Sequence, residues 1–190
     1  MNSVTSGDLI VSDERDLLIL VDEQDRPQGS LDKASCHDGD GILHRAFSLF
    51  IFDDAGRLLL QRRADGKRLW PGFWSNSCCS HPRHGETMDE AVHRRLEQEL
   101  GLSCTLLPLY KFRYQARYGV EGSEHELCSV YIGRSDSDPS VNSTEISAWR
   151  WIPADDLDAE LDATPDAFTP WFKLEWSRIR REHMDAVSTL

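Results

Sequence analysis

Residues 69–82 read LWPGFWSNSCCSHP, a stretch with two tryptophans, a Pro-Gly pair, two adjacent cysteines and a histidine. The Pro-Gly pair breaks any helix, and the polar run 75–80 offers too little apolar surface for a core segment. We therefore interpret the stretch as a loop that carries chemistry. Cys79 and His81 are separated by one residue, so an extended backbone would direct both side chains to the same side. An alternative without a functional role also remains open at this point, in which Cys79 is a small buried hydrophobic residue and His81 is a surface residue.

The composition predicts one soluble globular domain. The chain has 190 residues, of which 39% are hydrophobic and 28% charged, which is enough for a proper core. No apolar run approaches membrane-spanning length and the N-terminus lacks a basic-then-apolar signal pattern, so we expect no membrane association. The cysteines are odd in number and lack paired zinc-ribbon spacing, which favours a reduced cytoplasm. They stand at positions 36, 78, 79, 104 and 128.

The net charge of −12 argues against general binding to nucleic acid or to anionic membranes. An acidic protein that binds an anion needs a local basic patch. Residues 62–68 provide one, because four of these seven residues are basic. A solvated hairpin end is the alternative interpretation, but the position directly before residue 69 favours anion binding.

The domain organisation is simple. Residues 1–16 are polar and poorly patterned, and we expect a disordered or loosely ordered tail followed by a single domain over residues 17–190. Within the domain, residues 46–52 form a predicted buried strand, residues 53–56 a hairpin turn and residues 58–61 the returning strand. We see no internal repeat and no linker.

Two further histidines, His37 and His44, lie before this strand, with the turn-forming residues 38–41 between them. The two glycines in that turn forbid a continuous helix from His37 to His44. Each histidine alone is more easily explained as structural than as a metal ligand. Together with His81 they supply three imidazoles, which could act as metal ligands if the fold brought them to one site.

One helix is clearly marked. Thr87 and Glu90 have the form of a capping box, and Gly101 marks the helix end. Every fourth residue is apolar and forms the predicted core stripe: Met88, Val92, Leu96 and Leu100. Arg95 and Glu99 share a different face, where a surface ion pair is the simplest interpretation.

The second half of the chain predicts two strands, over residues 110–117 and 127–132, and a short strand over residues 149–153. An amphipathic helix follows from Thr169. The predicted loop between the first two strands contains several polar and ionisable residues, namely Glu121, Glu124, His125 and Glu126.

A partial signature overlaps the helix, with residues at the spacing G-x5-E-x7-R-E-U-x-E-E-x-G-U. The residues that align with it are Ser80, Glu86, Arg94, Glu99 and Gly101, of which Ser80 stands in place of the first glycine. This pattern resembles the Nudix signature, which implies an α/β (α+β) fold, an α/β/α sandwich with a mixed sheet. Arg95 and Gln98 stand where two metal-binding carboxylates of typical Nudix hydrolases are found, so the hydrolase signal is damaged while the fold signal survives.

Further motifs accompany the signature, in a fixed order along the chain. They are His37 and His44, the 69–82 loop, Phe112-Arg113-Tyr114, Glu124-x-Glu126, Asp162-Ala163-Thr164-Pro165 and Pro170-Trp171. From about residue 17 to the C-terminus, this combination closely resembles the metal-dependent isopentenyl diphosphate isomerases. The resemblance implies interconversion of isopentenyl and dimethylallyl diphosphate through a tertiary carbocation, in isoprenoid biosynthesis.

The resemblance also implies two metal sites. One Zn²⁺ or Mn²⁺ ion, which suits mixed nitrogen and oxygen ligands, would be bound by His37, His44, His81, Glu124 and Glu126. A Mg²⁺ ion that bridges the substrate diphosphate would be held by Glu99.

The remaining implied roles concern the substrate. Its diphosphate would contact four cations, Lys33, Arg63, Lys67 and Arg95. Cys79 and Glu126 would lie on opposite faces of the allylic carbons, where one delivers a proton and the other removes one, and Tyr114 would assist proton delivery. Trp171 would offer its π-face to the carbocation.

Two other functions remain as alternatives. A Nudix pyrophosphohydrolase would leave Cys79 and the histidines without a role, and a non-enzymatic metal-binding protein would not need Cys79 together with Glu126. The expected partner is the small-molecule diphosphate, with no nucleic acid and no membrane. A monomer and a homodimer are both compatible with the sequence.

Overall fold

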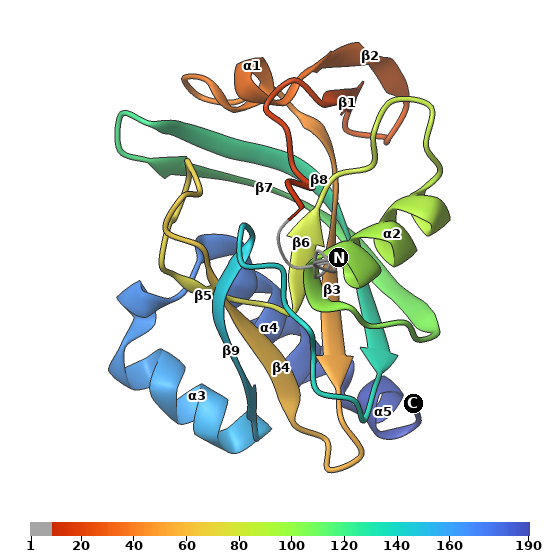
Figure 1. Ribbon diagram of the computed structural model, residues 1–190, viewed down its shortest axis with the longest axis vertical. Coiled ribbons are helices and arrows are strands. Elements are labelled where there is room, and N and C mark those ends of the chain that lie inside the picture. Colours follow the sequence, from red (N-terminus) through yellow and green to blue (C-terminus); the bar gives the residue numbers. More distant parts are fainter. Residues whose placement is uncertain (1–8) are drawn as a thin grey trace, which may run out of the picture.

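A computed structural model describes residues 9–190 and shows a strongly twisted sheet with helices on both sides (Figure 1). The strands are β1 (Leu17–Val21), β2 (Pro27–Asp32), β3 (His44–Phe52), β4 (Leu58–Arg63), β5 (Trp74–Ser75), β6 (Cys78–Ser80), β7 (Leu106–Tyr118), β8 (Gly122–Arg134) and β9 (Ile146–Ile152). The helices are α1 (Lys33–His37), α2 (Met88–Leu100), α3 (Ala154–Ala163), α4 (Pro170–Glu182) and α5 (Met184–Ser188), with the 3-10 turn η2 at Pro165–Ala167.

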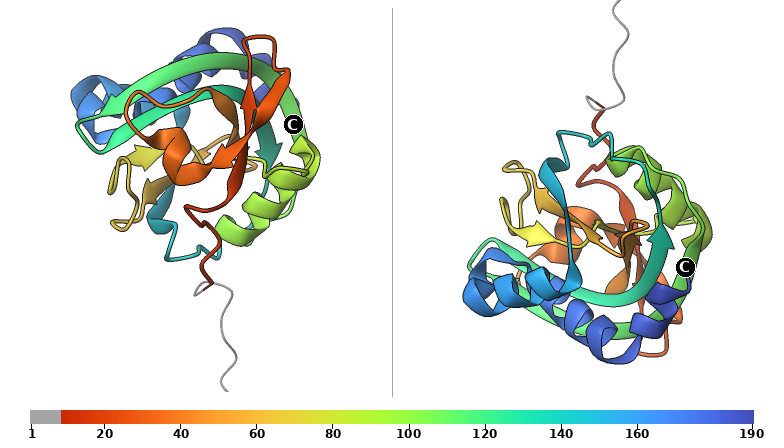
Figure 2. Two further views of the ribbon diagram at one scale, coloured as in Figure 1. Left: turned by 90° about the horizontal axis from the view of Figure 1, so that it is seen from above. Right: turned by 90° about the horizontal axis from the view of Figure 1, so that it is seen from below.

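Strand β3 is the centre of the sheet, and almost all of its residues are buried. Its alternate side chains enter two different cores: Phe50 packs in a cluster with Phe172 of α4, whereas Phe47 packs in a cluster with Leu96 of α2. β3 runs parallel to β8 and antiparallel to β6. The predicted α/β/α sandwich with a mixed sheet is therefore confirmed, as the end-on views also show (Figure 2).

The turn at residues 53–56 forms as predicted, but the hairpin around it does not continue. β3 and β4 pair only at Phe52 and Leu58 and then separate (Figure 1). β4 pairs instead with β9 and β5, while β6 and β8 occupy the two edges of β3. The predicted strand, turn and returning strand are therefore confirmed, but the two strands pair only next to the turn because strands from later in the chain take the edges that a longer hairpin would use.

Helix α2 confirms the prediction from its caps. The Thr87 hydroxyl accepts a hydrogen bond from the Glu90 amide, the Glu90 carboxylate accepts one from the Thr87 amide, and Gly101 ends the helix with a left-handed φ of 63°. Val92 and Leu96 are fully buried, whereas Met88 is only partly buried. The helix lies against β6, which it holds in place beside β3.

The polar residues around Glu124 lie in a strand and not in the predicted loop. β7 and β8 form a long antiparallel ribbon, and only residues 119–121 form the turn. Tyr114 of β7 pairs directly with Glu126 of β8. The prediction failed because ionisable residues have low strand propensity in solvent, whereas here they line an internal site.

The C-terminal helix α4 begins at Pro170, as predicted, but α3 was not expected. Of its ten residues only Leu157 is buried, so the apolar periodicity is too weak to mark a helix in the sequence.

The predicted tail lies only partly within the described residues, because residues 1–8 fall outside them. The Leu9 carbonyl accepts a hydrogen bond from Asn142, and the Val11 carbonyl accepts one from Arg95. Within residues 9–190, no helix is long and apolar enough to cross a membrane.

Candidate active site

A cavity of about 290 Å³ opens where α1, β8 and the segment 69–82, which includes β5 and β6, meet. It brings together most of the predicted site residues, from distant parts of the chain: Lys33, His37, Arg63, Lys67, Cys79, His81, Arg95, Tyr114, Glu124, Glu126 and Trp171. Of the predicted site residues, His44 and Glu99 are both buried and do not line the cavity. Cys79 and His81 both face this space, as the Cys-x-His spacing predicts.

A cluster of potential metal ligands forms one side of the cavity. One nitrogen or oxygen atom from each of His37, His44, His81, Glu124 and Glu126 lies within 4.8 Å of every other. The register of the central sheet explains part of the cluster, since His44 pairs with Glu126 across β3 and β8. β6 adds His81 at its end, and α1 adds His37.

Glycine 122 allows α1 to approach this strand closely. A Cβ atom at Gly122 would lie 2.3 Å from the carbonyl oxygen of His37, far inside the van der Waals distance. Gly122 also has a φ of 146°, which L-residues with side chains rarely adopt. Any larger residue at this position would displace α1 and with it the imidazole of His37.

The orientation of two imidazoles suits metal binding. Nδ1 of His37 lies 2.7 Å from the Lys33 carbonyl, and Nδ1 of His44 lies 2.7 Å from the Ile42 carbonyl. Because a carbonyl only accepts, each Nδ1 must carry a proton, so the neutral form of each ring has its lone pair on Nε2. Both Nε2 atoms point toward the cluster and are buried without a hydrogen-bond partner among the described residues.

The spacing of the ligand atoms also fits one divalent ion. His37 Nε2 and Glu124 Oε2 are 2.8 Å apart without hydrogen-bond geometry, and His81 Nε2 lies 2.8 Å from Glu126 Oε1. Neighbouring ligands about 2.1 Å from a shared octahedral ion would lie roughly 3 Å apart. Burial and repulsion by the other two imidazoles lower the pKa of His81 well below its usual value, which keeps this ring neutral for coordination.

Cys79 and Glu126 differ in protonation. Burial raises the pKa of the Cys79 thiol to about 12, so the thiol keeps its proton at neutral pH. Burial also raises the pKa of Glu126, but interactions with His44 and a hydrogen bond from Tyr114 outweigh it and lower the pKa overall. The Tyr114 hydroxyl donates to Glu126 Oε2 at 2.7 Å. The Cys79 thiol and the Glu126 carboxylate therefore face the same cavity, the first protonated and the second ionised.

The 69–82 loop fixes the aromatic and cationic wall of the cavity. Arg63 donates hydrogen bonds to the Leu69 carbonyl at 2.9 Å and to the Trp70 carbonyl at 3.1 Å, and its guanidinium lies 5.3 Å from the Trp171 ring centre. Trp70 and Trp171 contact each other edge to face, at 5.2 Å between ring centroids. Trp171 is only 2% exposed. The loop thus orients an arginine and a tryptophan toward the same space.

Helix α4 is attached to this loop directly. The Thr169 amide donates to the Trp74 carbonyl at 3.0 Å, and the Thr169 and Ser75 hydroxyls lie 2.9 Å apart. These contacts set the position of Trp171, two residues further along the chain. Pro170 therefore begins α4 at the point where Thr169 attaches the helix to residues 74–75, and Trp171 follows in its first turn.

Glu145 is a site residue that the sequence analysis missed. Its carboxylate is 3% exposed, pairs with Lys67 and lies 3.3 Å from Arg95. Burial raises the pKa of Glu145, but the two cations outweigh it and lower the pKa to about 2. Because buried cations need a counterion, Glu145 allows Lys67 and Arg95 to remain charged inside the protein. No local pattern around residue 145 distinguishes it from the many other acidic residues of the chain.

Arg95 and Glu99 form a buried pair, which excludes the surface ion pair considered above. Both residues are 2% exposed, and Arg95 donates two hydrogen bonds to Glu99 Oε1, at 2.9 and 2.6 Å. Arg95 therefore lies between Glu99 and the cavity-facing groups. The remaining signature residues, Glu86 and Arg94, pair at 2.5 Å beside the start of α2.

Comparisons with known proteins identify the relatives of this chain. The NUDIX domain family model matches residues 42–172. The chain is 44% identical over 172 residues to isopentenyl-diphosphate Delta-isomerase 1 of Photorhabdus laumondii, covering 90% of this chain and 98% of that protein. It is 47% identical over 155 residues to isopentenyl-diphosphate Delta-isomerase of Burkholderia multivorans, covering 82% of this chain and 88% of that protein.

Solved structures support the fold. The crystal structure of DR0079 from Deinococcus radiodurans matches with a TM-score of 0.70 and 25% identity, covering 88% of this chain and 99% of that one. The MutT protein from Methanosarcina mazei matches with a TM-score of 0.60 and 19% identity, over 74% of this chain and 94% of that one. With its NUDIX domain and its extensive identity to these enzymes, the chain belongs to the isopentenyl-diphosphate Delta-isomerase family.

Proposed function

We propose that this protein interconverts isopentenyl diphosphate and dimethylallyl diphosphate. One observation carries the proposal: Cys79, Glu126 and Trp171 face a single cavity that also contains a cluster of cations. Moving a double bond by one carbon needs a proton donor, a proton acceptor and protection of a cation from water. The cavity contains a residue suited to each of these tasks.

Cys79 and Glu126 are the proposed proton donor and acceptor. The Cys79 thiol gives its proton to the terminal alkene carbon, which leaves a tertiary carbocation at the neighbouring carbon. Glu126 then removes a proton from the carbon on the other side of the cation, and the new double bond forms there. Tyr114 holds the Glu126 carboxylate through its hydroxyl, and it is also proposed to assist proton delivery.

Trp171 is the proposed stabiliser of the carbocation. An aromatic face attracts a cation through its quadrupole, and the attraction is strongest where water is excluded. Trp171 and Tyr114 are both almost fully buried, with ring centroids 6.1 Å apart. This aromatic corner would also prevent water from trapping the intermediate.

Lys33, Arg63, Lys67 and Arg95 are the proposed diphosphate contacts. Binding energy from the diphosphate holds the substrate at a fixed distance from the reacting carbons. Glu99 would hold a Mg²⁺ ion that accompanies the diphosphate, a role that requires Arg95 to exchange its bonds with Glu99 for bonds with the substrate. Binding of the diphosphate to Arg95 would therefore free the Glu99 carboxylate from Arg95, so that the carboxylate could bind the Mg²⁺ ion.

The three histidines, Glu124 and Glu126 are the proposed ligands of a resident Zn²⁺ or Mn²⁺ ion. Such an ion would supply positive charge that keeps Glu126 ionised and fixes its orientation. The five free cysteines among the described residues support our further proposal of a cytoplasmic location.

The test is incubation of the purified protein with isopentenyl diphosphate and Mg²⁺ in D₂O, followed by NMR. We expect dimethylallyl diphosphate that carries deuterium at the new methyl group, since the added proton comes from solvent through the thiol. A parallel incubation with a nucleoside diphosphate sugar should release no phosphate or nucleotide, because Arg95 and Gln98 replace two hydrolase carboxylates. Hydrolysis without isomerisation would favour the pyrophosphohydrolase alternative.

A further inference from the structure

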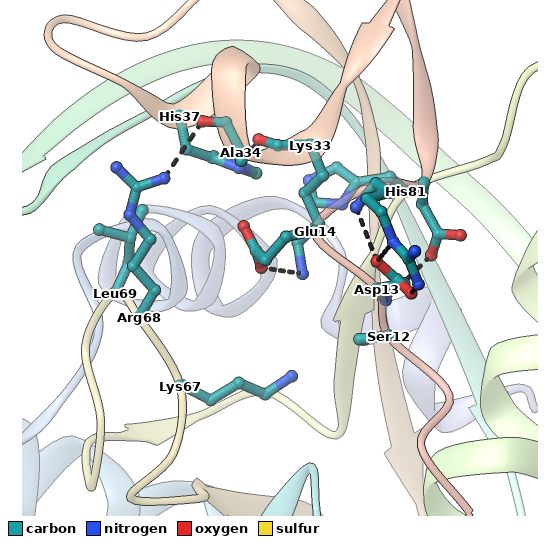
Figure 3. A network of polar contacts seen from close by, with 12 residues as sticks. Ser12, Asp13, Glu14, Lys33, Ala34, His37, Lys67, Arg68, Leu69 and His81 are labelled. Carbon is teal, nitrogen blue, oxygen red and sulfur yellow. Dashed lines mark hydrogen bonds and ion pairs between the residues drawn. The ribbon is translucent and has the colours of Figure 1, made fainter.

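The segment before β1 forms one wall of the cavity, and no role has been assigned to it above. Ile10, Ser12 and Glu14 all line the cavity. Figure 3 shows Ser12 and Glu14 in this segment. Two of these residues contact cations that are proposed to bind the diphosphate: Ser12 contacts Arg95, and Glu14 contacts Lys33.

The backbone of this segment is held at several points. The Val11 carbonyl accepts a hydrogen bond from Arg95 Nη1 at 2.7 Å, and the Ser12 hydroxyl accepts one from Arg95 Nη2 at 3.0 Å. The Glu14 carbonyl accepts a hydrogen bond from the Ala34 amide at 3.0 Å. Glu14 is therefore fixed beside the first turn of α1, where Lys33 lies.

The Glu14 side chain points into the cavity. Figure 3 shows its carboxylate in the space between α1 and Lys67, with Oε1 3.2 Å from Lys33 Nζ. The Lys33 side chain is 19% exposed, so most of its surface is already covered by protein. An incoming phosphate group that binds Lys33 must compete with this carboxylate for the same ammonium group.

Glu145 and Glu14 both line the cavity and pair with its cations, but they differ in how firmly they are held. The Glu145 side chain is 3% exposed and contacts both Lys67 and Arg95, so its removal would leave buried cations without a counterion. The Glu14 side chain is 49% exposed and has one ion-pair partner, Lys33, among the described residues. An exposed ion pair of this kind costs little to break. Compared with Glu145, Glu14 is thus the carboxylate that can more easily separate from its cation.

We infer that the Glu14 carboxylate is an internal anion that occupies the Lys33 position of the diphosphate site in the free protein and is displaced by the diphosphate. The inference rests on the proposed diphosphate substrate. Glu14 then influences substrate affinity. The diphosphate must break the Glu14–Lys33 ion pair, and the free energy of breaking that pair reduces the net free energy of diphosphate binding. The catalytic groups Cys79 and Glu126 are not involved.

The test measures binding of inorganic diphosphate with Mg²⁺ to the metal-loaded protein by calorimetry. Glu14→Gln removes the competing charge at constant shape and should tighten binding roughly two- to five-fold, the range expected for an exposed ion pair. Glu23→Gln is the matched control, since Glu23 is an exposed glutamate that pairs with Arg113 and does not line the cavity. It makes the same change in net charge and should leave diphosphate affinity unchanged.

A double-mutant cycle identifies the partner. In a Lys33→Gln background, Glu14→Gln should no longer tighten diphosphate binding. Weaker or unchanged binding by Glu14→Gln alone would overturn the inference, as would an equal gain in both backgrounds. Inorganic diphosphate has no alkene, so this result is independent of the isomerase reaction. If the binding data show that diphosphate displaces Glu14 but the protein does not isomerise isopentenyl diphosphate, the proposed function is rejected and the inference about Glu14 stands.

Discussion

The adjacent residues Cys78 and Cys79 show how one position along a strand changes the role of a side chain. Cys79 lines the cavity, whereas Cys78 is fully buried in the cluster with α2. Successive residues of β6 point to opposite faces of the sheet, so only one of the two thiols can reach a substrate.

We expect Cys79→Ala to abolish turnover without loss of fold or bound metal, because it removes the proposed proton donor. Cys78→Ala should retain most of the activity and lower the free energy of unfolding by about 1 kcal/mol, the effect of a small core cavity. Turnover, metal content and urea unfolding of the two variants provide the measurement. Equal losses of turnover would show that the two residues had been assigned to the wrong faces.

Glu175 is a second residue whose environment changes its chemistry. It is 1% exposed, and its Oε1 accepts a long hydrogen bond, 3.5 Å, from the Cys128 thiol. Burial raises the pKa of Glu175 to about 8, so the carboxyl is neutral at pH 7. In the unfolded chain the same group would titrate near its ordinary value, about 4.3.

This difference predicts the pH dependence of stability. Between about pH 5 and 8 the unfolded chain has already lost the Glu175 proton, whereas the folded protein keeps it. The free energy of unfolding should therefore fall with rising pH by up to about 1.4 kcal/mol per unit from this group, and the loss should be complete above pH 8. Glu175→Gln should remove this component, so that the variant gains stability over the wild type as pH rises. Urea unfolding at pH 5, 6.5 and 8 tests this, and parallel pH profiles would contradict it.

At the scale of elements, the short helix α1 carries much of the site. Its five residues include Lys33 and His37, and its N-cap is Asp32, whose carboxylate accepts a hydrogen bond from the Ser35 amide at 2.9 Å. A helix of this length is not stable by itself, so its cap and its contact with Gly122 determine where His37 lies.

Asp32→Ala should therefore weaken binding of the resident metal while lowering the free energy of unfolding by about 0.5–2 kcal/mol. The matched control is Thr87→Ala, which removes the cap of α2 and should cost a similar amount of stability with little effect on the metal. Urea unfolding gives the first quantity and competition with a chelator gives the second. A comparable loss of metal affinity in both variants would mean that general destabilisation, and not the position of α1, is responsible.

At the scale of the whole molecule, the ligand cluster joins parts of the chain that are distant in sequence. His37 comes from α1, His44 from β3, His81 from the end of β6, and Glu124 and Glu126 from β8. A metal ion bound by all five residues would link these elements and neutralise two buried carboxylates.

Removal of that metal should destabilise the entire domain. A ligand that binds only the folded state adds about 4 kcal/mol of stability at a thousand times its Kd, so a strong chelator should lower the Tm of the wild-type protein by several degrees. His81→Ala should have a lower Tm from the start and respond little to the chelator. Calorimetric scans with metal analysis provide the measurement. A full equivalent of tightly bound metal in His81→Ala would exclude the five-ligand site.

Local patterns in the chain were sufficient to predict the elements whose signals are contained within a few residues. The capping box of α2, the strand at β3 and the Cys-x-His spacing depend on neighbouring residues alone, and the structure has all three. The family resemblance predicted which residues form the site, because its motifs are specific in combination.

Other features depend on pairing between distant segments, which no local pattern reports. The hairpin after β3 opens because β6, β8 and β9 take its edges, and Glu124 and Glu126 lie in a strand because β3 pairs with β8. Glu145 and Glu14 become site residues only when the fold brings cations to them. The chemistry of a side chain limits what it can bind. The complete fold determines its partners and its burial, and these two set its charge.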